Sequence, residues 1–250
     1  MNNSLNLNRL NLLIKKDIAL SHSTIWIVTA LLVGLLLLGN LFSPNNVYSS
    51  NEEPTLFLWA LFIGGIWISA GAFKEAHNKL SSYAFFTLPA STIEKFFNKL
   101  LLTAVIYPLA ILLFYSAFYW LIAVIGKIVN GTMPPLFNPL QLSIAQDIWT
   151  YMIFQSIFFL GAIYFKNKVL IKTALTLVII SIIFGIFTAM IGALFARSLF
   201  VGNIFYLPSF ALLTSHAARS IGNIIHLSIW ILLPFFCWTI AYIRLGETEV

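Results

Sequence analysis

The sequence has very little charge. Only 9% of its 250 residues are Asp, Glu, Lys or Arg, whereas 60% are hydrophobic. A soluble domain carries charge at roughly a quarter of its positions, so this composition excludes a water-exposed globular surface. It predicts an all-α, polytopic membrane protein in which residues 1–250 form a single transmembrane domain.

Cysteine and the common catalytic patterns are also scarce. Cys237 is the only cysteine, so no intrachain disulfide can form. The nucleotide-binding pattern G-x-x-x-x-G-K-[ST], the zinc pattern H-E-x-x-H and the hydrolase pattern G-x-S-x-G do not occur, and the histidines are scattered. We expect no catalytic residue, no metal site and no cofactor in this chain. No basic stripe interleaved with aromatic residues occurs either, which excludes a nucleic acid partner.

Six apolar stretches are long enough to cross roughly 30 Å of hydrocarbon. They cover residues 24–42, 55–73, 100–126, 148–165, 173–196 and 221–243. The first run is too long for a secretory signal peptide and no small-residue cleavage site follows it, so we expect it in the mature protein. Residues 197–220 are too apolar for a solvated loop and are broken by Gly202 and Pro208, which predicts a short surface helix or re-entrant turn on the outer side.

The basic residues predict the orientation of these spans. With the N-terminus inside, the loops on the cytoplasmic side hold eleven of the fourteen Lys and Arg residues, and the outer side holds only Lys127, Arg197 and Arg219. Positive charge favours the cytoplasmic side. Both termini are therefore expected in the cytoplasm.

Residues 5–20 form the first of two amphipathic segments on that side. Leu7, Leu10, Ile14 and Ile18 recur at helical spacing, and polar residues occupy the other faces. Such a helix lies flat at the membrane surface. The alternative is an ordinary segment that precedes a span, with lysines that reach the headgroups.

The second amphipathic segment lies in the loop 74–99. Pro89 breaks the chain, and Ser91 with Glu94 matches an S-x-x-E capping box, which predicts a helix that begins near Thr92. Its apolar face holds Ile93, Phe96, Phe97 and Leu100, and we expect the intervening polar residues to face water or headgroups: Glu94, Lys95, Asn98 and Lys99. This surface either docks a partner or rests on lipid.

No charged residue lies well inside a predicted span, which disfavours ion-coupled transport because such carriers use charged groups at mid-membrane. Small residues instead form a stripe in the fifth span, at Gly185, Ala189, Gly192 and Ala196, and a shorter one in the second span, at Gly65, Ser69 and Ala72. Small residues let two helices approach closely. The partner helix belongs to a second copy or to the same protomer.

Taken together, four segments resemble the membrane subunits of ABC-2 type transporters, the permease class of bacterial ABC exporters. They read NLLIKKDI (11–18), FFTLPASTIEKFFNKLL (85–101), YFKNKVLIKT (164–173) and WTIAYIRLGETEV (238–250). The strongest piece runs from Leu88 to Lys95 and resembles an LP-x-S-x-x-E-K loop.

This resemblance implies a division of labour with other chains. Residues 5–20 would be a connecting helix, and the loop 74–99 would hold a coupling helix that seats on a separate ABC ATPase subunit, which binds ATP and Mg²⁺. Two permeases, as a homodimer or a pair, would form the substrate path in the bacterial plasma membrane. The residues implied for coupling are Tyr83, Leu88, Pro89, Ser91, Thr92, Glu94 and Lys95. Those implied for the dimer interface or pathway are Gly65, Ser69, Gly185, Ala189 and Gly192.

A second function fits the same sequence. The chain would then be a membrane anchor or scaffold for a cytosolic ATPase or assembly complex and would move no substrate. If it does transport, a path without charges favours a lipid, a drug or a hydrophobic peptide.

Overall fold

The computed structural model describes residues 6–20, 55–77, 83, 87, 90–130, 137–201, 228 and 230–247. All regular elements within these ranges are helices, as predicted. The expected span 24–42 lies outside the described residues, as do Leu88, Pro89, the start of the span 221–243 and most of the outer segment 197–220.

The second expected span is an almost unbroken helix. It consists of α3 (Thr55–Trp59), the π-helical turn η1 (Ala60–Gly64) and α4 (Gly65–Gly71), and the short helix α5 (Lys74–His77) follows it. The apolar stretch suitable for a membrane covers Phe57–His77.

The predicted coupling helix and the third span form one continuous helix. α7 (Thr92–Leu101) passes through the π-helical turn η2 (Leu102–Ile106) into α8 (Tyr107–Asn130). The turn η2 ends two residues before Pro108, whose nitrogen has no proton to donate to the carbonyl four residues before it. A local change of hydrogen-bond register accommodates this missing donor without ending the helix.

Tyrosine hydroxyls from neighbouring helices bind carbonyls in both π-helical turns. The hydroxyl of Tyr107 donates to the carbonyl of Ala60 in η1 at 2.6 Å, and that of Tyr151 donates to the carbonyl of Thr103 in η2 at 2.6 Å. Each π-helical turn therefore has a carbonyl that accepts a hydrogen bond from a side chain of a neighbouring helix.

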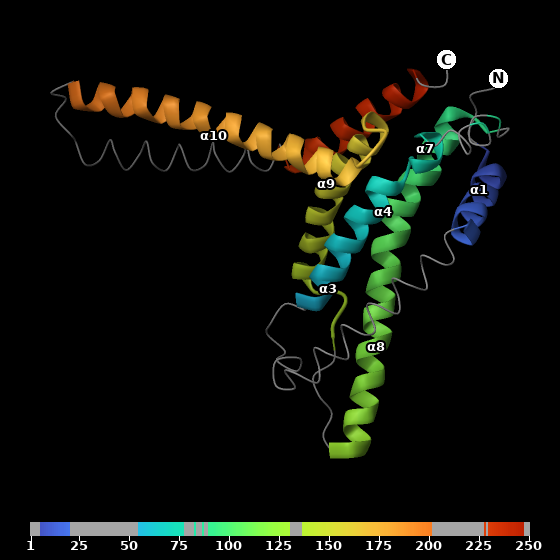
Figure 1. Cartoon of the computed structure of the whole chain (residues 1–250). Coiled ribbons are helices and arrows are strands. Elements are labelled where there is room, and N and C mark those ends of the chain that lie inside the picture. Colours follow the sequence, from blue (N-terminus) through green and yellow to red (C-terminus); the bar gives the residue numbers. More distant parts are fainter. Residues whose placement is uncertain are drawn as a thin grey trace.

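Two further helices complete the bundle. α9 (Leu142–Tyr164) packs against α4, and the helix of residues 230–247 packs against the charged end of the bundle. Figure 1 shows α4, α8 and α9 side by side. The core between them has an aromatic cluster at each end, with Phe73, Phe96 and Phe159 in one and Phe57, Tyr115 and Tyr151 in the other.

The helix α10 (Val169–Val201) leaves this bundle across the direction of α8 (Figure 1). Its 33 residues are predicted to span about 50 Å at 1.5 Å per residue. Ile183, Phe184 and Ile186 are each more than half exposed. No residue in the most apolar 18-residue stretch of Val169–Ile191 is buried. Such a surface requires an apolar environment, either lipid or another protein.

Three described helices are long and apolar enough to cross a membrane: Phe57–His77, Thr92–Ile125 and Val169–Ile191. The coarse prediction of an all-helical membrane protein therefore agrees with the fold. The helix α10 includes the expected fifth span, 173–196, and extends beyond it at both ends, from Val169 to Val201.

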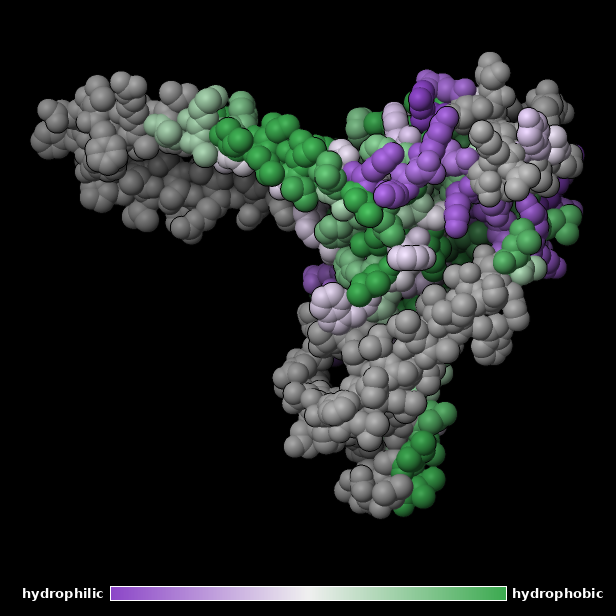
Figure 2. All heavy atoms as spheres, viewed as in Figure 1, coloured by the Kyte–Doolittle hydropathy of each residue, from purple (hydrophilic) through white to green (hydrophobic). Residues whose placement is uncertain are grey.

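Hydrophilic residues gather at one end of the bundle. Figure 2 shows them where α1 (Leu7–Leu20), α7 and the turn between α9 and α10 lie, whereas hydrophobic residues cover the part of α10 nearer the bundle and the far part of α8. This is the distribution expected for a bundle with one end in water or headgroups and its sides in lipid.

Candidate functional site

The start of α7 has the predicted capping box. The Ser91 hydroxyl accepts a hydrogen bond from the Glu94 amide at 3.3 Å, and the Ser91 amide donates to Oε2 of Glu94 at 2.9 Å. α7 begins at Thr92, as the sequence predicts. Two backbone amides that the helix itself leaves unpaired are thereby satisfied.

Glu94 also holds the start of α1. Its Oε1 accepts a hydrogen bond from the Asn6 amide at 2.9 Å, across 88 residues of sequence. The Asn6 side chain in turn accepts from the Asn8 amide at 3.0 Å, which is the geometry of a helix N-cap. One carboxylate therefore links the first turns of two helices.

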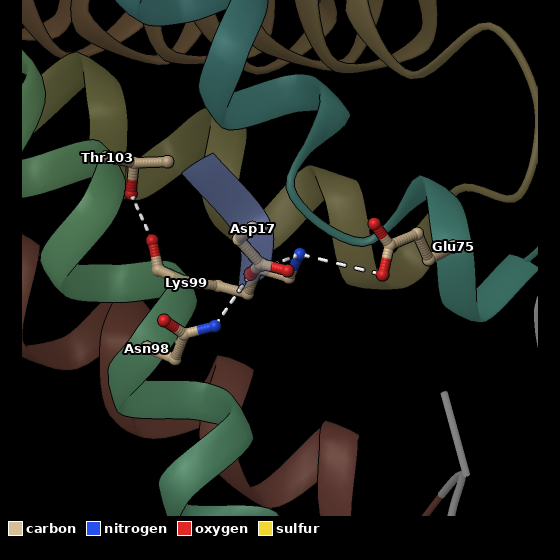
Figure 3. A network of polar contacts seen from close by, with 5 residues as sticks. All are labelled: Asp17, Glu75, Asn98, Lys99 and Thr103. Carbon is tan, nitrogen blue, oxygen red and sulfur yellow. Dashed lines mark hydrogen bonds and ion pairs between the residues drawn. The ribbon is translucent and has the colours of Figure 1, made fainter. Parts of the chain in front are cut away.

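A buried ion pair holds the other end of α1. Oδ2 of Asp17 lies 2.9 Å from Nζ of Lys99 and accepts a hydrogen bond from the Asn98 amide group at 2.6 Å. The Lys99 ammonium also lies 3.8 Å from a carboxylate oxygen of Glu75, in α5 (Figure 3). We refer to these contacts, together with the bond from Asn6 to Glu94, as the α1–α7 brace.

The expected orientation of the polar residues in α7 is wrong. We predicted that Glu94, Lys95, Asn98 and Lys99 face water or headgroups, but all four are buried, and Glu94 has no exposed surface. Phe97, assigned to the apolar face, is 37% exposed. The reason is that α1 packs on α7 and supplies partners for Glu94, Asn98 and Lys99.

The buried face of α1 differs in the same way. Leu13 and Asp17 are buried, whereas Ile18, which we placed on the apolar face, is 42% exposed. An apolar stripe alone predicts a face toward lipid, but a carboxylate turned inward requires a cation opposite it. Lys99 provides that cation.

The brace continues into the bundle through Thr103. Its hydroxyl donates to the Lys99 carbonyl at 2.9 Å (Figure 3) and accepts from the Gln155 amide group at 2.8 Å. The oxygen of the Gln155 side chain accepts from the Trp238 indole at 3.2 Å. Hydrogen bonds thus connect the end that holds the brace to the helix of residues 230–247.

Gly65 and Ser69, expected at a dimer interface or pathway, are used within the protomer. A Cβ at Gly65 would overlap the ring of Tyr151 from α9, and the buried Ser69 hydroxyl donates to the Gly65 carbonyl at 2.7 Å. The small residues of the second span therefore allow α4 and α9 to pack closely.

The other expected site residues differ in their surroundings. Among the described residues, no heavy atom lies within 4 Å of a Cβ built on Gly185, and Ala189 is exposed. The surroundings of Gly192 lie outside what the structure describes. Tyr83 is 79% exposed. Thr92 is the first residue of α7.

The sequence predictions did not include Asp17, Glu75, Gln155 or Trp238 as interacting residues. One signal pointed to Asp17, because it is the only acidic residue before Glu52 and lies three to seven positions from Leu10, Leu13 and Ile14 on one helical face. Nothing local pointed to Gln155.

Within the described part of the chain, no three His, Cys, Asp or Glu side chains are grouped to hold a metal ion. Comparison of the chain with protein-family models, curated proteins and solved structures finds no match. The function is therefore argued from the fold and the α1–α7 brace.

Proposed function

We propose that the chain is the permease subunit of an ATP-driven ABC exporter, which works as a dimer with a separate ATPase subunit. One observation carries this proposal. The helix expected to contact the ATPase, α7, is the first part of one continuous helix from Thr92 to Ile125, which is long enough to cross a membrane. A continuous helix transmits a displacement at its end along its whole length, which a flexible loop does not do.

The brace supports the same function. A helix end that receives force has to be held to its surroundings, and α7 is tied to α1 at Glu94 and at Lys99 and to α5 through Glu75. Because these groups are buried and bonded to one another, α1 and α7 are expected to move as one body.

Glu94 and Lys95 are buried, so we no longer propose that they contact the ATPase. Charge reversal at these positions would disturb folding as well as docking, because a buried charge without its partner is costly. Exposed residues of the loop 74–99 are better suited to contact a partner, and the described ones are Lys74, Tyr83, Thr87 and Phe97.

The membrane placement follows from charge and apolarity. The proposed location is the bacterial plasma membrane with both termini cytoplasmic, supported by hydrophilic residues at one end of the bundle (Figure 2) and by the exposed apolar surface of α10. α10, with Gly185 and Ala189, then faces lipid or the second permease.

Site-specific photocrosslinking tests the docking surface. A photoreactive phenylalanine analogue at Tyr83, in native membranes, is expected to capture a P-loop ATPase. The matched control places the analogue at Leu113, which is 69% exposed on α8 and is expected to capture lipid only. Equal capture of the ATPase from both positions, or capture from neither in the folded protein, would contradict the proposal.

A scaffold for an ATPase also predicts the crosslink, so a second measurement separates the two functions. A permease couples ATP hydrolysis to its cargo, whereas a scaffold does not. Stimulation of ATP turnover by hydrophobic drugs, lipids or peptides in the reconstituted complex supports the permease. Turnover that no such compound changes supports the scaffold.

A further inference from the structure

The packing of α1 on α7 buries the acidic residue of α1 and leaves its basic residues at least partly exposed. Asp17 is turned inward and bonded to Lys99 and Asn98, so its charge is compensated inside the protein. Arg9 and Lys15 are exposed and Lys16 is partly exposed. No other acidic residue occurs before Glu52. The exposed charges of α1 are therefore all positive.

The two lysines carry most of this free charge. Neither Lys15 nor Lys16 forms an ion pair with a described residue, whereas Arg9 is close enough to Glu94 to be attracted to its carboxylate. At helical spacing, Lys15 lies opposite Asp17 and Leu13, and Lys16 lies on the flank of α1 between them.

Apolar side chains accompany these lysines. Leu12 is 66% exposed and Leu20 is 63% exposed, although both are large hydrophobic residues. Cations interspersed with exposed leucines fit the boundary between headgroups and acyl chains, where the leucines leave water and the ammonium groups meet phosphate. An acidic protein partner would complement the lysines but would have to supply apolar surface as well.

We infer that the exposed flank of α1, with Lys15, Lys16, Leu12 and Leu20, is a binding surface for anionic phospholipid headgroups. The brace presents this surface already folded, so lipid binding does not have to order the helix. Each lysine at an anionic membrane surface contributes about fivefold to the affinity. This inference needs only a membrane location and does not depend on coupling to an ATPase.

A fluorophore on α1 of the full-length protein tests the inference. Cys237 is first removed as Cys237→Ala, and Leu12→Cys then carries an environment-sensitive dye. The protein in neutral detergent is titrated with mixed micelles that contain phosphatidylglycerol or, separately, phosphatidylcholine. Phosphatidylglycerol is expected to shift the emission to the blue, and phosphatidylcholine is expected to have little effect.

Two double variants decide the role of the lysines. Lys15→Gln with Lys16→Gln is expected to raise the phosphatidylglycerol midpoint by about fivefold for each lysine removed. Lys127→Gln with Lys166→Gln removes the same charge from exposed positions elsewhere and is expected to leave the midpoint unchanged. Equal responses to both lipids, or an unchanged midpoint without Lys15 and Lys16, would overturn the inference. A response to soluble polyglutamate but not to phosphatidylglycerol would reassign the surface to an acidic protein.

Discussion

Breaking the ion pair between Asp17 and Lys99 should release α1, and the effect should depend strongly on which partner is removed. Lys99→Met leaves the Asp17 carboxylate buried, with only the Asn98 amide group beside it. Removal of one partner from a buried pair costs about 3–5 kcal/mol. The carboxylate regains water when α1 separates from α7, so the variant weakens the docking of α1 on α7 by this amount of free energy.

Asp17→Asn should cost much less. The new side chain keeps an oxygen that can accept from Asn98, and Lys99 keeps Glu75 at 3.8 Å as a second partner. A charge-assisted hydrogen bond, about 1.5–3 kcal/mol, is then replaced by a neutral one, about 0.5–1.5 kcal/mol, so the loss is roughly 1–2 kcal/mol. The double variant Asp17→Asn with Lys99→Met has no uncompensated charge at these two positions and should resemble Asp17→Asn alone.

Hydrogen exchange of the amides in residues 6–20, followed by mass spectrometry in mild detergent, measures this release. Since each 1.36 kcal/mol is tenfold, we expect acceleration on the order of a hundredfold or more in Lys99→Met and roughly tenfold in Asp17→Asn. Arg244→Gln breaks the exposed pair with Glu247 and should leave α1 unchanged. Equal acceleration in the two single variants, or additive effects in the double variant, would refute the reasoning.

Three further predictions concern thermal stability, measured by scanning fluorimetry in detergent. Ser91→Ala removes the cap of α7 and should cost about 1 kcal/mol, whereas Ser91→Thr keeps the hydroxyl and should restore most of it; equal losses would argue against the cap. Gly65→Ala forces the new methyl into the Tyr151 ring and should destabilise by about 1–3 kcal/mol, whereas Gly71→Ala meets no atom within 4 Å and should be tolerated; the reverse order would contradict the α4–α9 packing. Gln155→Leu deprives Trp238 of its acceptor and should cost about 1–3 kcal/mol, and an unchanged melting temperature would show that this link contributes little.

Features that depend on neighbouring residues were predictable from the sequence. The capping box of Ser91 and Glu94 involves atoms three residues apart, and the structure confirms it together with the start of α7 at Thr92. The apolar runs behind Phe57–His77 and Val169–Ile191 were equally evident, because span length and hydropathy are local properties.

Features that depend on long-range packing were not predictable. We assigned the polar side of α7 to water. Helical periodicity shows that Glu94 and Lys99 lie on one side of the helix, but it does not show whether water or another helix covers that side. Asp17 and Asn98 are 81 residues apart, and only the docking of α1 brings them together. Tyr107 and Tyr151 likewise donate to carbonyls of the π-helical turns that are 47 and 48 residues away in the sequence.

Affinity purification tests most directly whether this chain couples to a cytosolic ATPase through α7, as we propose. The tagged full-length protein is purified from native membranes in mild detergent, co-purifying chains are identified and ATP turnover is assayed. A P-loop ATPase in stoichiometric amount, with turnover that falls when Lys99→Met loosens the brace, is the predicted result. Reproducible absence of such an ATPase from the folded protein would contradict the account.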